Sequence, residues 1–299
     1  MNAVTDYFLG LTRPSIKTVS NSEKNSLLWK YYLFHRNIEN LIEQYYLDRN
    51  KFYKTKHSIS FCTTVMDRFE HLSETFIKNI IDNQTYPSCE YILLNYNCPD
   101  PRTDHYVKTV LAEYIESGRV TYYKYNNSSG PEYNASHARN LAFRLALNDI
   151  VCNVDADNFI GAGFADYVSA MFNFESIFLR GPVDRRGIAG RICCYKRHWE
   201  DIGGYDERFM HWGVEDSDFA ERLGRIGIEK KTILNEKFCK CIQHDNDIRS
   251  RHYPVDIRTS YKSNKTIKID NDESGIVNPN GHNFGHGHVL KNFTVPIKV

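Results

Sequence analysis

From residue 58 onward, short apolar runs alternate with stretches in which apolar residues recur every three or four positions. The apolar runs predict strands, and the spacing of three to four predicts helices between them. The strand runs cover 58–65, 91–96, 120–125 and 150–152, and the helical patterns cover 69–80, 104–117 and 138–146. Successive units of this length predict a parallel sheet with right-handed crossovers and helices on both faces.

The same alternation continues at 164–172, 176–180, 190–195 and 197–202, and a further helix begins near Asp216. Before residue 56 the pattern differs, because apolar and aromatic residues between Leu27 and Tyr45 recur at helical spacing over a long stretch. We expect that helix to pack on the main domain; a dimer contact, which would make the protein a homodimer, and a membrane-surface contact are the alternatives.

The expected organisation is therefore an α/β fold in three parts. An N-terminal helical extension covers residues 1–55, a main domain with a mostly parallel central sheet covers 56–250, and a tail or flap over the active site covers 251–299. The last part contains three histidines among glycines at 282–288. These histidines suit a flap, a solvated loop or, as the weakest alternative, a metal site.

Polar residues follow three of the predicted strands, at 64–68, 95–97 and 155–157. Ligands of open α/β sheets bind outside the carboxyl ends of the strands. Asp155 and Asp157 are separated by one residue, and a hard cation such as Mg²⁺ or Mn²⁺ carrying a diphosphate would hold both carboxylates together. The alternative is a solvated Asp-x-Asp turn.

The most distinctive segment is 203–219, in which Trp212 precedes the acids Glu215, Asp216 and Asp218. Acids at the start of a helix are favoured by the helix dipole, so capping is one interpretation of Asp216 and Asp218. Capping does not explain the presence of Trp212. An indole beside a carboxylate is a common arrangement for holding a sugar.

Composition and charge restrict the partners. The chain is 41% hydrophobic and 25% charged, and its formal net charge is +1. This balance argues against nucleic acid as the main partner. Lys230 and Lys231 are a small basic patch that suits a solvated turn or, alternatively, a lipid headgroup or phosphate.

The sequence has neither a long apolar segment nor the pattern of a secretory signal at its start, so we expect a cytoplasmic protein. Contact with the inner face of the membrane as a peripheral protein is compatible with this expectation. The eight cysteines form no CxxC pairs and lie mostly in apolar runs, which predicts buried free thiols.

Three segments in this order resemble the inverting GT-A glycosyltransferases, especially β-1,4-galactosyltransferases and bacterial polysaccharide polymerases of the chondroitin type. They are the strand with 63–68, the helix around 138–142 that leads into 154–157, and the run 203–216. The resemblance spans roughly 57–250 and implies a GT-A fold, Rossmann-like, that uses a UDP-sugar donor and Mn²⁺ or Mg²⁺.

The resemblance also implies a role for individual residues. Asp216 would be the general base, and Trp212 and Glu215 would hold the acceptor. Asp157 and His244 would bind the metal, with Cys241 at a position where the family has Met. The residues expected around the nucleotide sugar are Thr64, Asp67, Arg68, Asn95, Arg139 and Asp155.

These roles predict an enzyme that moves a hexose or N-acetylhexosamine, with Gal or GalNAc favoured, to a saccharide or lipid-linked saccharide in surface polysaccharide synthesis. The small residues 187–189 lie near the donor-gating position of the family. A metal-dependent nucleotidylyltransferase is an alternative, although 63–69 lacks the Gly-rich basic loop that it would need. A non-catalytic saccharide-binding module of the same fold is the other alternative.

Overall fold

The computed structural model describes residues 41, 44, 56–126, 132–173, 176–183, 187–244 and 254–299. The chain divides into two compact units, Met1–Tyr45 and Tyr46–Val299. Leu41 and Gln44 are the described residues of the first unit, and both are helical. The helix predicted between Leu27 and Tyr45 otherwise lies outside the described residues, so what it packs against stays a prediction.

The second unit is built on a nine-stranded sheet in the order β11-β10-β3-β2-β1-β4-β7-β6-β8. Its strands are β1 (Ile59–Val65), β2 (Cys89–Tyr96), β3 (Val120–Tyr125), β4 (Ile150–Asn153), β6 (Ile177–Arg180), β7 (Ile192–Tyr195), β8 (Glu229–Thr232), β10 (His288–Lys291) and β11 (Val295–Lys298). Strands β3, β2, β1 and β4 pair in parallel, as do β6 and β8. Strands β7 and β10 run antiparallel to their neighbours. The mostly parallel sheet predicted from the sequence is confirmed.

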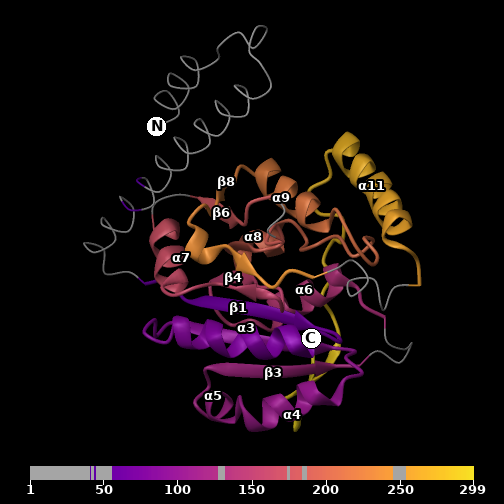
Figure 1. The fold of residues 1–299 in the computed structure, drawn as a ribbon. Helices are drawn as coiled ribbons and strands as arrows, with labels where there is room; N and C mark the ends of the chain where they lie inside the picture. Colours follow the sequence, from indigo (N-terminus) through magenta and orange to yellow (C-terminus); the bar gives the residue numbers. More distant parts are fainter. Residues whose placement is uncertain are drawn as a thin grey trace, which may run out of the picture. The chain divides into compact units, whose positions relative to one another are not determined.

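Helices cover both faces of this sheet (Figure 1). They are α3 (Phe69–Asp82), α4 (Pro101–Thr109), α5 (Ala112–Glu116), α6 (Ala135–Leu145), α7 (Phe164–Phe172), α8 (Lys196–Asp201), α9 (Glu215–Arg225) and α11 (Ile257–Ser274). Side chains alternate across each strand, so Tyr91 and Leu93 of β2 pack in one core with α3 and α7, whereas Ile92 and Leu94 pack in a second core with α6, α8 and α9.

Strand register brings the predicted polar ends together. Val65 at the end of β1 pairs with Asn95 near the end of β2, and Cys62 pairs with Asn153 at the end of β4. Because these strands are parallel, the residues that follow them emerge at the same edge of the sheet. The helix predicted as one piece at 104–117 is two helices, α4 and α5, and Asp100 caps the first by accepting a hydrogen bond from the Arg102 backbone.

The segment 251–299 belongs to the second unit, and its role as a tail or flap over the active site stays a prediction. It contributes the 18-residue helix α11 and the strands β10 and β11. Strand β10 extends the sheet beyond β3, where Val289 pairs with Tyr125. The short β10 and β11 runs carry too few alternating residues for a strand prediction, and the edge of β3 supplies their hydrogen-bond partners.

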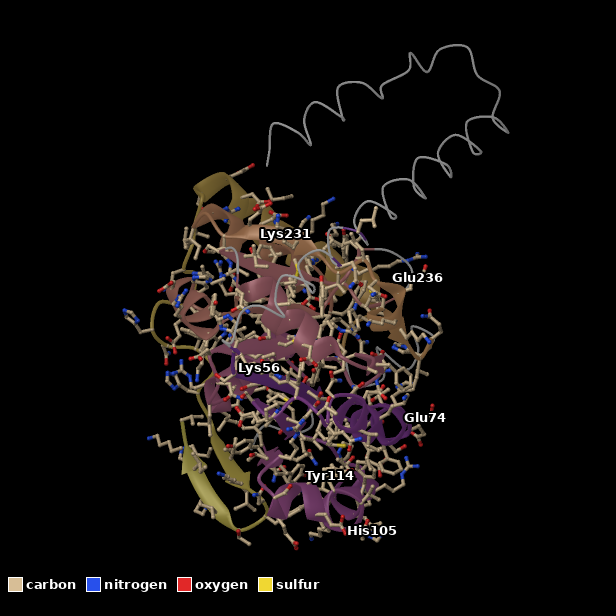
Figure 2. The ribbon with its side chains drawn as sticks, turned by 90° about the vertical axis from the view of Figure 1, so that its left-hand side faces the viewer. Lys56, Glu74, His105, Tyr114, Lys231 and Glu236 are labelled. Carbon is tan, nitrogen blue, oxygen red and sulfur yellow. The ribbon has the colours of Figure 1, made fainter. Side chains whose placement is uncertain are left out.

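Lys230 and Lys231 lie on β8, the last strand of the sheet, and not on a solvated turn. Lys230 is exposed, and Lys231, labelled in Figure 2, pairs with Glu229 at 2.8 Å. Lysine on an edge strand discourages pairing with other chains. Across the residues that the structure describes, no helix combines the length and the apolar character needed to cross a membrane.

Candidate active site

The two acids that follow β4 face different partners. Asp155 accepts hydrogen bonds from Asn153 at 2.9 Å and from Arg139 at 3.3 Å. Asp157 contacts His244, with 2.8 Å between Oδ2 of Asp157 and Nε2 of His244. The Asp-x-Asp pair is therefore not a simple solvated turn, since each carboxylate is held by side chains from a distant part of the sequence.

A small second sheet brings His244 to Asp157. Strand β5 (Asn158–Phe159) pairs antiparallel with β9 (Lys240–Cys241), and the Ile242 amide then donates to the Asp157 carbonyl at 2.8 Å. Burial opposes ionisation of Asp157, but the hydrogen bond and charge of His244 outweigh burial and lower the pKa of this carboxyl. Asp157 is thus favoured as an anion, the form that binds a cation.

Sequence reasoning missed His71, which lies in the first turn of α3. Its ring centroid is 5.3 Å from that of His244, and burial together with the charge of Arg68 lowers the pKa of His71. A neutral imidazole therefore stands beside the Asp157 and His244 pair. Within the described ranges, no group of three or more His, Cys, Asp or Glu side chains is arranged to hold a metal ion.

Arg139 of α6 connects the acid that follows β4 to two acids at the start of α9. Its guanidinium is buried and lies 3.3 Å from Asp155, 3.0 Å from Glu215 and 2.9 Å from Asp216. The ring of Tyr205 lies 5.4 Å from the same guanidinium. Arg139 was predicted to contact the nucleotide sugar, and in the structure its charge is shared among these three carboxylates.

Asp216 stands at the start of α9 in an environment that disfavours its charge. Burial raises the pKa of its carboxyl to about 7; the Arg139 guanidinium opposes this shift, and the Glu215 and Asp155 carboxylates add to it. A methyl group placed on Gly190 would lie 3.0 Å from carboxylate oxygens of both Asp155 and Asp216. The two acids therefore flank one glycine, a close approach that the sequence did not reveal.

Asp216 and Asp218 lie in the first turn of α9, where the helix dipole favours acids, and the N-cap residue Val214 makes no side-chain capping hydrogen bond. Asp216 faces Arg139, and Asp218 is fully buried with its oxygen 2.7 Å from Nε of Arg222. The acids are directed inward at cations, because α9 starts in a core that contains two buried arginines.

Trp212 lies in a loop with unusual backbone geometry. His211, Gly213 and Val214 all have positive φ, and at Val214 the angle is 78°. A positive φ is a genuine outlier for a β-branched residue, and such outliers cluster at functional sites. Trp212 precedes Glu215 by three positions, and its role in holding a sugar stays a prediction.

The predicted donor residues on β1 and β2 lie at the expected strand ends. Thr64 shares a 2.8 Å hydrogen bond with Tyr133, and the Asp67 backbone has positive φ and donates to the Cys98 sulfur. The charge of Arg68 acts on Asp157. Asn95 is buried, and its amide donates to Asp104 and Tyr122, so it braces β2 against α4 and β3 within the protein.

All eight cysteines are free thiols, and six of them are buried, as predicted. Cys241 is partly exposed, accepts a hydrogen bond from Gln243 at 3.0 Å and would lie 3.2 Å from a methyl group on Gly187. The predicted donor-gating residues 187–189 therefore begin next to Cys241.

The histidine-rich segment packs against α6 and α8. Phe284 is buried, with its ring 5.0 Å from that of Trp199, and the Gly285 amide donates to Glu207 at 2.7 Å. The His286 carbonyl lies 2.9 Å from the His137 ring nitrogen. These contacts attach the segment to α6 and α8, and its role as a flap over the active site stays a prediction.

A family model matches part of the chain. A family model described as the N-terminal domain of galactosyltransferase matches residues 179–247, the part that contains Trp212, Glu215, Asp216 and His244. No curated protein matches the sequence.

Two solved structures share the fold. A mannosyltransferase from Pyrobaculum calidifontis, in complex with GDP-Man and Mn²⁺, is 17% identical with a TM-score of 0.51, covering 70% of this chain and 67% of its own. TarS from S. aureus, in complex with UDP-GlcNAc, is 13% identical with a TM-score of 0.50, covering 66% of this chain and 61% of its own. The chain thus has the GT-A fold, and the matched segment and the fold together support a glycosyltransferase enzyme.

Proposed function

We propose that this protein is a metal-dependent inverting glycosyltransferase that moves a hexose or N-acetylhexosamine from a UDP-sugar to a saccharide acceptor. One observation carries the proposal. The guanidinium of Arg139 lies within 3.3 Å of Asp155, Glu215 and Asp216, so an acid that follows β4 and two acids of α9 share one cation. Donor and acceptor groups would meet at this point.

The residues next to this cluster suit a divalent metal that carries the donor diphosphate. The Asp157 carboxylate and the His244 imidazole present donor atoms 2.8 Å apart, and oxygen and imidazole ligands suit Mn²⁺. Two protein ligands leave positions for phosphate oxygens and water, as is usual for ions at diphosphate sites. When bound, the metal would stabilise negative charge on the departing diphosphate.

Asp216 is the proposed general base. The acceptor hydroxyl forms a bond to C1 of the donor sugar as the bond from C1 to the diphosphate oxygen breaks, and its proton passes to Asp216. A pKa raised to about 7 suits this role, because a base with a pKa near the working pH is available and still accepts a proton readily. A single displacement inverts the anomeric centre, so an α-linked UDP-sugar gives a β-linked product.

The acceptor side is formed by Trp212 and Glu215. Glu215 is buried and accepts a hydrogen bond from Arg139 at 3.0 Å, which holds its carboxylate in the site. The indole can pack on the apolar face of a sugar while carboxylates take its hydroxyls. The matched galactosyltransferase segment favours Gal or GalNAc as the donor sugar, and a surface polysaccharide or lipid-linked saccharide is the proposed acceptor.

The test is UDP release from a panel of UDP-sugars with Mn²⁺, with and without EDTA, for the wild type and for Asp157→Ala. We expect release from one or two donors that requires both the metal and Asp157. Asp166→Ala is the matched control, because Asp166 lies in α7 and its carboxylate pairs only loosely with Lys56, at 3.8 Å. This variant should release UDP at the wild-type rate.

If no UDP-sugar in the panel releases UDP and calorimetry shows no UDP binding, the proposal is contradicted and a non-catalytic saccharide-binding module is favoured. Equal UDP release with and without EDTA would contradict only the role of the metal. An α-linked product seen by NMR would contradict inversion.

A further inference from the structure

The acceptor loop, defined as residues 210–214, is held in its strained conformation by a helix that lies outside the matched galactosyltransferase segment. Ser260 of α11 accepts a hydrogen bond from the Trp212 amide at 2.9 Å and donates to the Trp212 carbonyl at 2.8 Å. The backbone N–H and C=O of Trp212 are therefore both hydrogen-bonded to the Ser260 hydroxyl. Ser260 is buried, so water does not compete for these bonds.

Asn264, one turn further along α11, makes more contacts with the same loop. Its amide nitrogen donates to the carbonyls of Met210, Trp212 and Gly213 at 2.9, 3.2 and 2.9 Å, and its oxygen accepts from the Met210 amide at 3.2 Å. Asn264 is buried as well. A strained loop persists only where its surroundings over-determine it, and these bonds supply that restraint.

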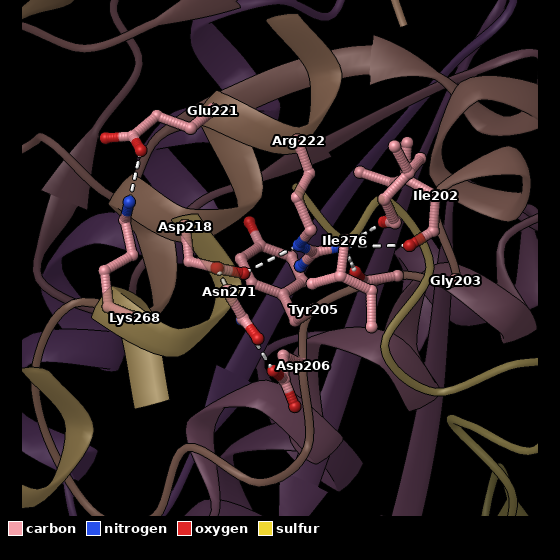
Figure 3. Close-up of polar contacts among 12 residues, drawn as sticks. Ile202, Gly203, Tyr205, Asp206, Asp218, Glu221, Arg222, Lys268, Asn271 and Ile276 are labelled. Atoms are coloured by element: carbon pink, nitrogen blue, oxygen red, sulfur yellow. Dashed lines mark hydrogen bonds and ion pairs between the residues drawn. The ribbon is translucent and has the colours of Figure 1, made fainter. Parts of the chain in front are cut away.

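The same helix is attached to α9, which carries Glu215 and Asp216 (Figure 3). Asn271 donates to Asp206 at 3.0 Å and to Asp218 at 2.8 Å, and Asp218 in turn binds Arg222. Lys268 pairs with Glu221 of α9. Helix α11 therefore contacts both the acceptor loop and the helix of the proposed base.

We propose that α11 is a positioning element of the acceptor site, in which Asn264 and Ser260 act through the acceptor loop to hold Trp212 against the acceptor sugar. This inference rests on the proposed transferase function. The ring of Tyr261, which is 44% exposed, lies 6.2 Å from the Trp212 ring and extends the same surface. The residues proposed for the donor side, Asp157 and His244, follow β4 and β9 and lie outside α11.

The test compares kinetic constants for acceptor and donor in Asn264→Ala and Ser260→Ala. We expect the KM for the acceptor to rise at least about tenfold in Asn264→Ala, because the Gly213 carbonyl loses its donor, the Met210 and Trp212 carbonyls keep only Ser260, and the loop relaxes. The KM for the donor and the affinity for UDP by calorimetry should stay within about twofold of the wild type. Lys265→Ala, at an exposed position of the same helix, should leave all constants unchanged.

A double-mutant cycle separates positioning from general loss of structure. If Asn264 acts through Trp212, then Asn264→Ala should raise the acceptor KM much less in a Trp212→Ala background than in the wild type. Additive effects would overturn the proposal, as would parallel losses in acceptor and donor binding. If Asn264→Ala does not fold, Asn264→Asp, which keeps the shape but loses the donor, and Ser260→Ala carry the same test.

The outcome also separates this inference from the proposed function. If the wild type transfers sugar and the acceptor KM is unchanged in Asn264→Ala, Asn264→Asp and Ser260→Ala, the role of α11 is overturned and the transferase function stands. A wild type with no transfer would overturn both.

Discussion

At the residue scale, Arg139 determines how the acids of the site behave. Three carboxylates around one buried guanidinium share its single charge. Among them, the pKa of Asp216 is raised to about 7 by burial, to which the Glu215 and Asp155 carboxylates add. Asp155 and Glu215 are each hydrogen-bonded to Arg139, and we propose that they bind substrate groups.

The pH dependence of transfer follows from this arrangement. A base acts when deprotonated, so kcat should rise with pH through about 7 and then level off. Asp216→Asn should lower kcat by roughly 10²- to 10⁴-fold and remove this rise, whereas Asp201→Asn, at an exposed position of α8, should keep the wild-type profile. Initial rates between pH 5.5 and about 9 measure both profiles.

Thermal unfolding of Asp216→Asn gives an independent check. The pKa of Asp216 is higher in the folded protein than its ordinary value of 3.8, so this group favours folding less as pH rises from that value toward about 7. Above pH 7 the ionised carboxylate opposes folding, and Asp216→Asn should be at least as stable as the wild type. A clearly lower Tm at pH 8 would instead indicate a structural role.

At the scale of elements, α9 and α11 form one polar unit around Asn271. The side chains of Asp206 and Asp218 are fully buried, and each receives a hydrogen bond from the Asn271 amide (Figure 3). Arg222 donates to Asp218 and to the carbonyls of Ile202 and Gly204. Each buried acid thus depends on donors from another element, because water cannot reach it.

Asn271→Ala should destabilise the protein, since both buried carboxylates lose a donor. We expect the free energy of unfolding to fall by about 1–3 kcal/mol, measured by urea denaturation. Glu273→Ala, at an exposed position of the same helix, should change it by less than about 0.5 kcal/mol. Equal stabilities of Asn271→Ala and wild type would mean that Arg222 and Arg208 satisfy the two acids without Asn271.

At the scale of the whole second unit, the sheet is completed by the last residues of the chain. Strand β10 covers the edge of β3, and beyond it Asn292 exchanges hydrogen bonds with the Tyr122 backbone at 2.8 and 3.0 Å. The Phe293 ring lies 4.8 Å from that of Tyr122. The C-terminal residues therefore protect a long strand that would otherwise present unpaired backbone groups.

Removal of residues 288–299 should expose that strand. We expect a lower Tm and concentration-dependent aggregation, measured by thermal unfolding and light scattering, because β3 would have an open edge. Val295→Thr, at a half-exposed position of β11, keeps the strand pairing and should keep the wild-type Tm. A truncated chain that stays monomeric with an unchanged Tm would show that β10 is dispensable.

Much of the central fold could be predicted because its signals are local. The apolar run of β1 and the helical spacing of Phe69, Leu72 and Phe76 in α3 are determined by which faces are buried, and these patterns appear in the sequence itself. The strand-end position of Asp155 and Asp157 follows from the same patterns. The resemblance in the segment around Trp212 supplied the remaining roles.

What the sequence alone determined is thus the order of strands and helices from 58 to 225 and the acids at their ends. Only the tertiary structure decided that Arg139 joins three of those acids, that Gly190 lies between two of them and that α11 holds the acceptor loop. These features depend on contacts between residues tens of positions apart. The hydrophobic periodicity of the sequence does not indicate such contacts, because they form only when separate elements pack together.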